Sequence, residues 1–228
     1  WSPARNTAFT TDILQFSSGG TSTAINVPTQ TVTRVLVSGS TDISLQSNAA
    51  ATFTINGPTA TTNLSIASGS NLQVSNNAST TTLLLNFGAT TGQLGNIAGT
   101  LRVNLNGTFT TTVTNPVTFA AGGTYHHDIN GGTIPTGAVW NATSTLNITG
   151  ITTTNPANFA GNYGNIVWNC ISTQSATGAL TGVATLAGNL TVTSGTFNLS
   201  SFVLNVAGNV VNNGNFGSTT GTLVMNGT

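Results

Sequence analysis

The chain has 228 residues, and only 3% of them are charged: three Lys or Arg and three Asp or Glu, which cancel to a net charge of zero. Soluble domains usually carry roughly a quarter charged residues. Three scattered arginines cannot form the basic surface that nucleic acids or anionic membranes require, and no apolar run approaches the ~20 residues of a membrane-spanning helix, so nucleic-acid binding and membrane insertion are excluded.

Short runs with apolar residues at alternate positions recur along the whole chain, and Gly, Asn or Ser closes each of them. Such alternation places the apolar side chains on one face of a β-strand. Helices are not expected, because the chain has no Lys or Glu and is rich in Thr, Asn and Gly. In chain order, the predicted strands include 32–37, 43–45, 53–55, 64–66, 72–74, 83–85, 101–105, 146–148, 190–192, 203–206 and 223–225.

These runs also repeat at longer range, with a period of about 20 residues that falls at the short end of the known repeat architectures. Three alignments indicate the period: 43–47 with 64–68, 82–86 with 100–104, and 187–190 with 207–210. Several short strands in each period are typical of a β-solenoid, in which stacked coils pair their strands in parallel around a continuous apolar core. The sequence therefore predicts an all-β, right-handed parallel β-helix, with 1–228 forming a single segment of a longer chain. A β-sandwich of antiparallel strands is the alternative.

The middle of the chain departs from this rhythm. Val139-Trp140-Asn141 matches Val167-Trp168-Asn169 at a longer spacing than the other alignments. A longer spacing indicates coils that carry loop insertions. We therefore expect longer coils or inserted loops around 120–170.

Thr and Asn have a structural explanation in such a fold. Asn is suited to turns, and stacked Asn and Thr side chains form hydrogen-bonded ladders between coils. The single cysteine, Cys170, rules out an internal disulfide framework, and a small buried apolar residue is the preferred interpretation of it.

Segments at both ends of the chain carry a resemblance to a known class of proteins. These segments are 1–5 and 11–16 near the start, and 188–199 and 206–214 near the end. They resemble β-helical, adhesin-like surface proteins of the Bacteroidota that the type IX secretion system exports. The resemblance implies a location outside the cell or on its surface, and contact with the secretion machinery.

The titratable residues do not form a recognisable catalytic or metal-binding pattern. In a strand over 126–128, only His126 and Asp128 share a face, and two side chains are too few for a closed zinc site. Asp12, Asp42 and Asp128 are far apart in sequence, whereas glycoside hydrolysis needs two carboxylates at a set separation. We therefore expect no catalytic residue, no metal site and no cofactor, and the protein is not expected to be an enzyme.

Two other residue patterns suggest binding surfaces. Trp140, Trp168, Tyr125 and Tyr163 are candidates for a strip on which sugar rings stack, although burial in the core explains the same residues. Thr-x-Thr pairs, such as Thr31-Thr33 and Thr52-Thr54 about one coil apart, are a feature of ice-binding solenoids, but Thr is so abundant that most pairs are expected by chance.

The favoured function is that of an extracellular structural or adhesive segment, serving as a stalk, spacer or fibre unit in a large cell-surface or secreted protein. Its near-zero charge favours self-association. The expected partners are other copies of the chain, neighbouring surface proteins and glycans. A carbohydrate- or ice-binding module is the alternative.

Overall fold

The computed structural model describes residues 11–76, 82–88, 90–217 and 220–227, and every regular element within these ranges is a β-strand. Strands of successive coils pair in parallel, as β2 with β5 and β18 with β21. The predicted β-solenoid is therefore confirmed, and the antiparallel sandwich is wrong. Residues 1–5, which contribute to the resemblance above, lie outside the described ranges. No helix long and apolar enough to cross a membrane occurs among the described residues.

The chain divides into two compact units, Trp1–Thr118 with Pro135–Ala138 and Phe119–Ile134 with Val139–Thr228. Two short strands, β13 (Val117–Phe119) and β15 (Ala138–Trp140), contain residues of both units. The strands of the first unit are β1 (Ile13–Phe16), β2 (Gly20–Ala24), β3 (Gln30–Val32), β4 (Arg34–Val37), β5 (Thr41–Ser47), β6 (Ala51–Ile55), β7 (Thr62–Ile66), β8 (Asn71–Asn76), β9 (Leu83–Phe87), β10 (Leu94–Ile97), β11 (Thr100–Asn104) and β12 (Gly107–Thr110). Those of the second unit are β14 (Thr124–Asp128), β16 (Thr145–Ile148), β17 (Gly161–Tyr163), β18 (Asn165–Asn169), β19 (Gly178–Ala179), β20 (Ala184–Leu186), β21 (Leu190–Ser194), β22 (Thr196–Asn198), β23 (Val203–Val206), β24 (Val210–Asn212), β25 (Asn215–Gly217) and β26 (Thr222–Met225).

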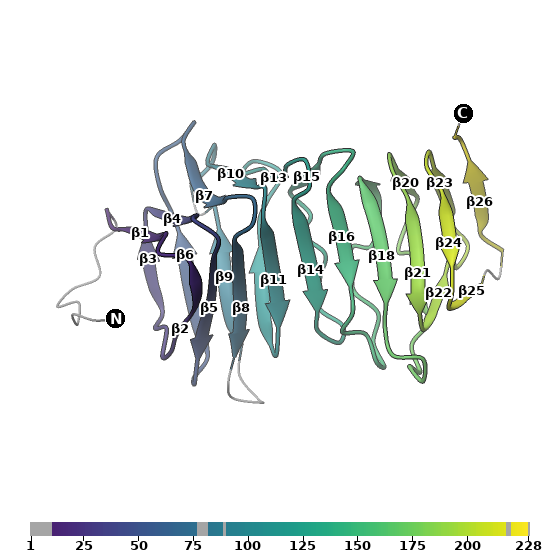
Figure 1. Ribbon diagram of the computed structural model, residues 1–228, viewed down its shortest axis with the longest axis horizontal. Coiled ribbons are helices and arrows are strands. Elements are labelled where there is room, and N and C mark those ends of the chain that lie inside the picture. The colour runs from purple at the N-terminus through teal and green to yellow at the C-terminus, as the bar shows by residue number, and fades with distance from the viewer. Residues whose placement is uncertain (1–10, 77–81, 89, 218–219, 228) are drawn as a thin grey trace. The chain divides into compact units, whose positions relative to one another are not determined.

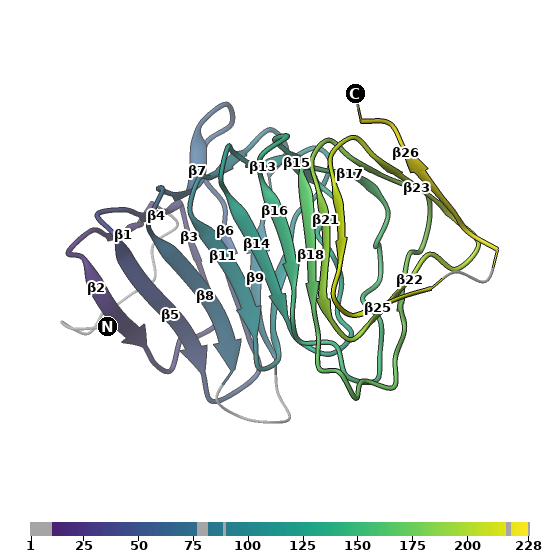
Figure 2. The ribbon, with the colours of Figure 1, turned by 45° about the vertical axis from the view of Figure 1, so that its right-hand side comes forward.

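The first unit stacks coils of three strands each, and each strand of a coil belongs to a different sheet. The three sheets run β1-β4-β7-β10, β2-β5-β8-β11 and β3-β6-β9-β12. Figure 2 shows β2, β5, β8 and β11 lying side by side along one face. Each strand is short because the chain turns after it to enter the next sheet of the coil.

The coil register of the first unit differs from two of the predicted alignments. The alignment of 43–47 with 64–68 is wrong, because these segments lie in β5 and β7, which belong to different sheets. The alignment of 82–86 with 100–104 is wrong for the same reason, since they lie in β9 and β11. The true partners are β5 with β8 and β8 with β11, where Asp42 pairs with Asn71 and Asn71 with Thr100. These coil steps are longer than the predicted period.

The second unit has the same three-sheet construction, and Figure 1 shows β14, β16, β18 and β21 side by side in one of its sheets. Its sheets run β14-β16-β18-β21-β24, β17-β20-β23-β26 and β19-β22-β25. Here the predicted alignment of 187–190 with 207–210 is confirmed, because Leu190 pairs with Val210. The matching of Trp140 with Trp168 is wrong, since β15 and β18 lie in different sheets.

Two long connections of this unit are 149–160, between β16 and β17, and 170–177, between β18 and β19. The first lies within the region 120–170, where the sequence predicts inserted loops, and the second follows that region. The coils themselves are not lengthened between β14 and β18, where Thr124 pairs with Thr145 and Thr145 with Asn165. The longest coil steps lie instead in the first unit, where Ala51 pairs with Leu83 and Thr62 pairs with Leu94.

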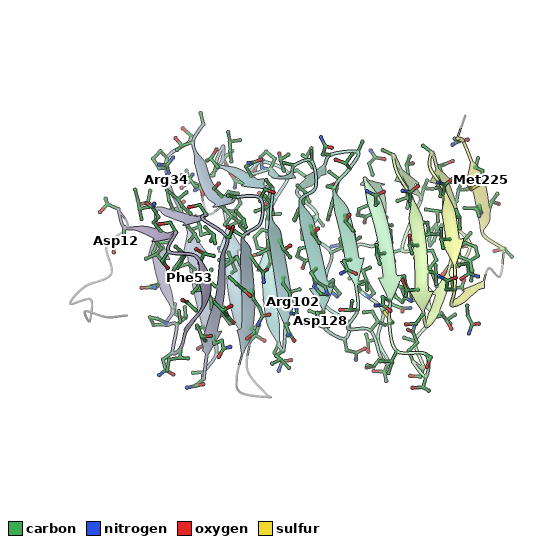
Figure 3. The ribbon with its side chains drawn as sticks, in the orientation of Figure 1. Asp12, Arg34, Phe53, Arg102, Asp128 and Met225 are labelled. Atoms are coloured by element: carbon green, nitrogen blue, oxygen red, sulfur yellow. The ribbon has the colours of Figure 1, made fainter. Side chains whose placement is uncertain are left out.

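Alternation of burial along each strand builds the core of both units. In β6, residues 51, 53 and 55 are buried and the two threonines between them are half-buried. Phe53 points inward and is 1% exposed, whereas Arg34 and Arg102 stand on outward positions of their strands (Figure 3). Full burial of one such apolar side chain contributes about 1.5–3 kcal/mol. Stacked apolar columns therefore stabilise the fold with few ion pairs needed.

Gly107, at the start of β12, shows how closely successive coils approach. A Cβ atom added there would lie closer than 3.0 Å to the backbone carbonyl oxygens of Val74 and Asn104. We expect Gly107→Ala to lower the free energy of unfolding by about 1–3 kcal/mol or more, because the backbone itself must shift. Gly217→Ala is the matched control, since its new Cβ would meet only the Asn198 amide at 3.7 Å. Urea denaturation measures both, and equal losses would contradict the explanation.

Candidate functional site

The four aromatic residues proposed to form a glycan-stacking strip do not form one on the surface. Trp168 is 0% exposed, Tyr125 1% and Tyr163 4%, so these three rings belong to the core of the second unit. Trp140 is half-buried and stacks on Phe119, with ring centroids 4.3 Å apart and planes 12° from parallel. Of the four residues, only Trp140 is therefore partly exposed.

Trp168 lies in a cluster of aromatic rings from several coils. Its ring stacks on Phe159 at 6.2 Å and meets Phe197 edge-to-face at 5.6 Å. Phe197 in turn stacks on Phe216 of the next coil at 5.8 Å. The indole nitrogen of Trp168 is buried and has no hydrogen-bond partner in the described structure. These contacts give the residue a packing role.

His126 and Asp128 lie on one outward face of β14, as the alternation predicts, and a threonine joins them. Thr149 Oγ1 donates to Asp128 Oδ1 at 2.8 Å, and His126 Nε2 lies 2.8 Å from the same Oγ1. Because the hydroxyl proton points to the carboxylate, the imidazole donates to the hydroxyl oxygen. This chain of hydrogen bonds links β14 to the following coil.

His127 points inward from the same strand and is fully buried. Its Nε2 lies 2.7 Å from the carbonyl oxygen of Gly131, to which it donates, and its Nδ1 has no partner. Burial lowers the pKa of His127 from 6.5 to about 4, although the Gly131 carbonyl and the charge of Asp128 act in the opposite direction. The ring is therefore neutral at physiological pH.

Cys170 is also a core residue, as the sequence suggests. It is 1% exposed, and its Sγ lies 3.7 Å from the carbonyl oxygen of Ile148. Burial raises the pKa of the thiol to about 12. A thiol that stays protonated is a poor nucleophile and a poor metal ligand.

The two aspartates of the first unit are held by different strands. The backbone oxygen of Asp12 accepts from the amide of Thr33 at 2.8 Å, whereas Asp42 Oδ1 accepts from the side-chain amide of Asn71 at 3.0 Å. Asp12 precedes β1 and Asp42 lies in β5, and these strands belong to different sheets. In the part of the chain that the structure describes, no three His, Cys, Asp or Glu residues gather as they would around a metal ion.

The first unit has a shallow depression at the corner where the chain leaves β2 and β5. It encloses about 250 Å³ and is lined by residues 26–29 and 47–51. None of these residues is charged or titratable. Asn48 closes part of it by donating to the Asn26 side chain at 2.5 Å. The depression offers amide and hydroxyl groups but no acid, base or aromatic ring.

The two threonine pairs proposed for ice binding are not aligned in register between neighbouring coils. A rank would place Thr31 opposite Thr52 and Thr33 opposite Thr54. Instead Thr31 pairs with Thr54, so Thr33 does not lie opposite a threonine of the second pair. These two pairs do not form a rank.

Asparagine side chains form the predicted ladder between coils, at the entrances to β18, β21 and β24. Asn165 Oδ1 accepts from the backbone amide of Asn189 at 2.8 Å, and Asn189 Oδ1 accepts from that of Asn209 at 2.7 Å. Asn165 Nδ2 also donates to the carbonyl oxygen of Ser144 at 3.0 Å. The Asn ladder, residues 165, 189 and 209, therefore ties each coil to the next through a side chain in addition to the sheets.

The glycines that precede the ladder residues are a sterically required part of it. A Cβ atom at Gly188 would collide with Asn165 Oδ1, and one at Gly208 would collide with Asn189 Oδ1. The repeated Gly-Asn pair is thus the sequence signal of the ladder, and it carries the one alignment that is confirmed.

A further asparagine that bonds two segments of the chain together was not predicted from the sequence. Asn130 Oδ1 accepts from the backbone amides of Thr152, Thr153 and Thr154 at 2.9, 2.8 and 2.9 Å, and Asn130 Nδ2 donates to Thr153 Oγ1 at 2.9 Å. One side chain thereby fixes the start of the long connection after β16. Asn130 has no repeat partner in sequence, so no spacing could have revealed it.

No protein-family model, curated protein or solved structure matches this chain. The resemblance to Bacteroidota surface proteins stays a prediction.

Proposed function

We propose that this chain is an extracellular structural or adhesive β-solenoid segment, a stalk, spacer or fibre unit of a large cell-surface or secreted protein. The Asn ladder is the observation that supports this role most directly. It adds side-chain hydrogen bonds between coils to the backbone bonds of three sheets, and all of them must break when coils separate. A stack held this way resists extension.

The outer surface supports the adhesive part of the proposal. Outward strand positions carry hydroxyl and amide groups, such as Ser44 and Gln73, which bond to each other at 3.2 Å across coils. Such groups offer many weak hydrogen bonds to glycans or neighbouring proteins, and with almost no charge they do not repel another neutral surface. In keeping with the resemblance, we propose export by the type IX secretion system and display at the cell surface.

Pulling on single molecules through tags at both ends tests the structural role. Asn189→Ala leaves the Asn209 amide without its acceptor, so we expect a lower unfolding force and a loss of about 1 kcal/mol in the free energy of unfolding. Asn189→Asp keeps an acceptor oxygen and should restore most of the force. A wild-type chain that unfolds at forces no higher than those of ordinary globular domains would overturn the proposal.

A carbohydrate-binding module is the second candidate, and the half-buried ring of Trp140 is the observation that favours it. Its test is binding to an array of polysaccharides by the wild type and Trp140→Ala. Binding that the substitution abolishes, in a variant with an unchanged circular dichroism spectrum, would favour this candidate over the structural one.

A further inference from the structure

Threonines of the first unit gather on the outer face of one sheet, β3-β6-β9-β12, whose first three strands lie side by side in Figure 1. Two rows of outward side chains cross this sheet, with one residue of each row in every coil. The pairing register gives the rows as Thr29, Thr52, Leu84 and Thr108, and as Thr31, Thr54, Asn86 and Thr110. Six of these eight residues, which we call the Thr face, are threonine. The register that separates the pairs predicted from the sequence therefore aligns other pairs.

The neighbouring sheet shows that this enrichment belongs to one face and does not simply follow from the composition of the chain. Its matched outward positions carry three threonines among eight: Thr21, Asp42, Asn71 and Thr100 in one row, and Thr23, Ser44, Gln73 and Arg102 in the other. The charged residues Arg34, Asp42 and Arg102 all stand on strands of the other two sheets. The Thr face contains no charged and no aromatic residue.

The side chains of the Thr face are held in place before any ligand binds. Threonine is branched at Cβ, so its side chain has few rotamers. Thr29 Oγ1 accepts from the backbone amide of Thr52 at 3.1 Å, and Thr110 Oγ1 donates to Asn86 Oδ1 at 3.0 Å. The inward residues between the two rows are buried core side chains: Phe53, Leu85 and Phe109. A surface that is ordered in advance loses little conformational entropy on binding.

The spacing and chemistry of the Thr face indicate its ligand. Paired strands lie ~4.8 Å apart, and residues two apart on one strand lie ~6.6 Å apart. These two repeats are close to those of the water molecules on a plane of an ice crystal. Each hydroxyl can donate and accept a hydrogen bond with such water, and the methyl groups fill the spaces between. The Thr face has no ring on which a sugar could stack. We propose that the Thr face binds ice.

Freezing experiments on the purified chain test the proposal. We expect the chain to be taken up into slowly growing ice, and to lower the freezing temperature of its solution below the melting temperature. Thr54→Tyr places a bulky ring near the middle of the Thr face and should abolish both effects. Thr23→Tyr is the matched control, because it places the same ring at an exposed outward position of the neighbouring sheet, and it should keep both. Far-UV circular dichroism verifies that both variants are folded.

A second variant tests the Thr face through a gain of activity, which misfolding cannot imitate. Leu84 interrupts its row between Thr52 and Thr108, and its side chain is half-buried on the outer face. Leu84→Thr completes the row with a fourth threonine. We therefore expect this variant to widen the gap between the melting and freezing temperatures relative to the wild type.

Three outcomes would overturn the proposal. The first is a wild-type chain that growing ice excludes and that leaves the freezing temperature unchanged. The second is an equal loss of activity in Thr54→Tyr and Thr23→Tyr. The third is binding to a polysaccharide array that Thr54→Tyr abolishes while uptake into ice is unaffected, since the ligand would then be a glycan. The proposed structural role is tested by the unfolding force, which does not involve ice, so the two proposals can fail separately.

Discussion

Replacing Trp168 by alanine is expected to lower the free energy of unfolding by about 3–5 kcal/mol. The indole is 0% exposed and contacts Phe159 and Phe197, so its removal leaves a large cavity in the aromatic cluster. Guanidinium denaturation followed by far-UV circular dichroism measures the loss. A secondary effect on any glycan binding would come from unfolding, since the ring is not at the surface.

Two control variants make the result for Trp168 specific. Trp168→Phe keeps most of the packing and removes a buried indole N–H that has no partner, so its cost should be well below that of alanine. Trp140→Ala removes a ring that is only half-buried and should also cost less. If the alanine variants at both positions were equally destabilised, the assignment of Trp168 alone to the core would be contradicted.

The sequence was sufficient to predict the class of fold, because the parallel solenoid depends on features that every coil shares. Alternation such as that in 53–55 fixes which side chains point inward, and the lack of Lys and Glu removes the residues that favour helices. These are average properties, and a single irregular coil does not change them.

Coil register could not be predicted in the same way, because most strands of a coil look alike. The segments 43–45 and 64–66 are both apolar-serine-apolar, yet they lie in different sheets. So short an alternation says which face is inward but not which sheet the strand joins. The alignment of the Gly-Asn pairs was correct because both residues are needed for one contact between coils. Gly208 leaves room for the side-chain amide of Asn189.

The candidate glycan strip failed for a related reason. Val-Trp-Asn occurs twice, but a tripeptide does not reveal the depth of its ring. Trp168 is inward because it alternates with the buried Ile166 and Cys170, whereas Trp140 ends a short strand. The joining of His126 and Asp128 by Thr149 depended on the coil step, which sequence alone left open.

His127 should make the stability of the protein fall as the pH is lowered from 6.5 toward 4. In the unfolded chain this histidine binds a proton near pH 6.5, but in the folded chain burial holds its pKa at about 4. The unfolded state therefore binds more protons in this window, which favours unfolding. At pH 4.5 we expect the free energy of unfolding to be about 2–3 kcal/mol lower than at pH 7.5.

The scarcity of charge in this chain makes the effect unusually easy to isolate. The sequence holds only two histidines and three acidic residues. His127→Gln keeps an amide that can donate to the Gly131 carbonyl but cannot titrate. The difference between the urea midpoints at pH 7.5 and pH 4.5 should therefore be smaller in this variant than in the wild type. His126→Gln, on the outward face, should keep the wild-type difference. If instead His126→Gln removed the acid sensitivity and His127→Gln did not, the hydrogen bonds of His126 with Thr149 and Asp128, rather than the buried ring, would be the source of the pH dependence.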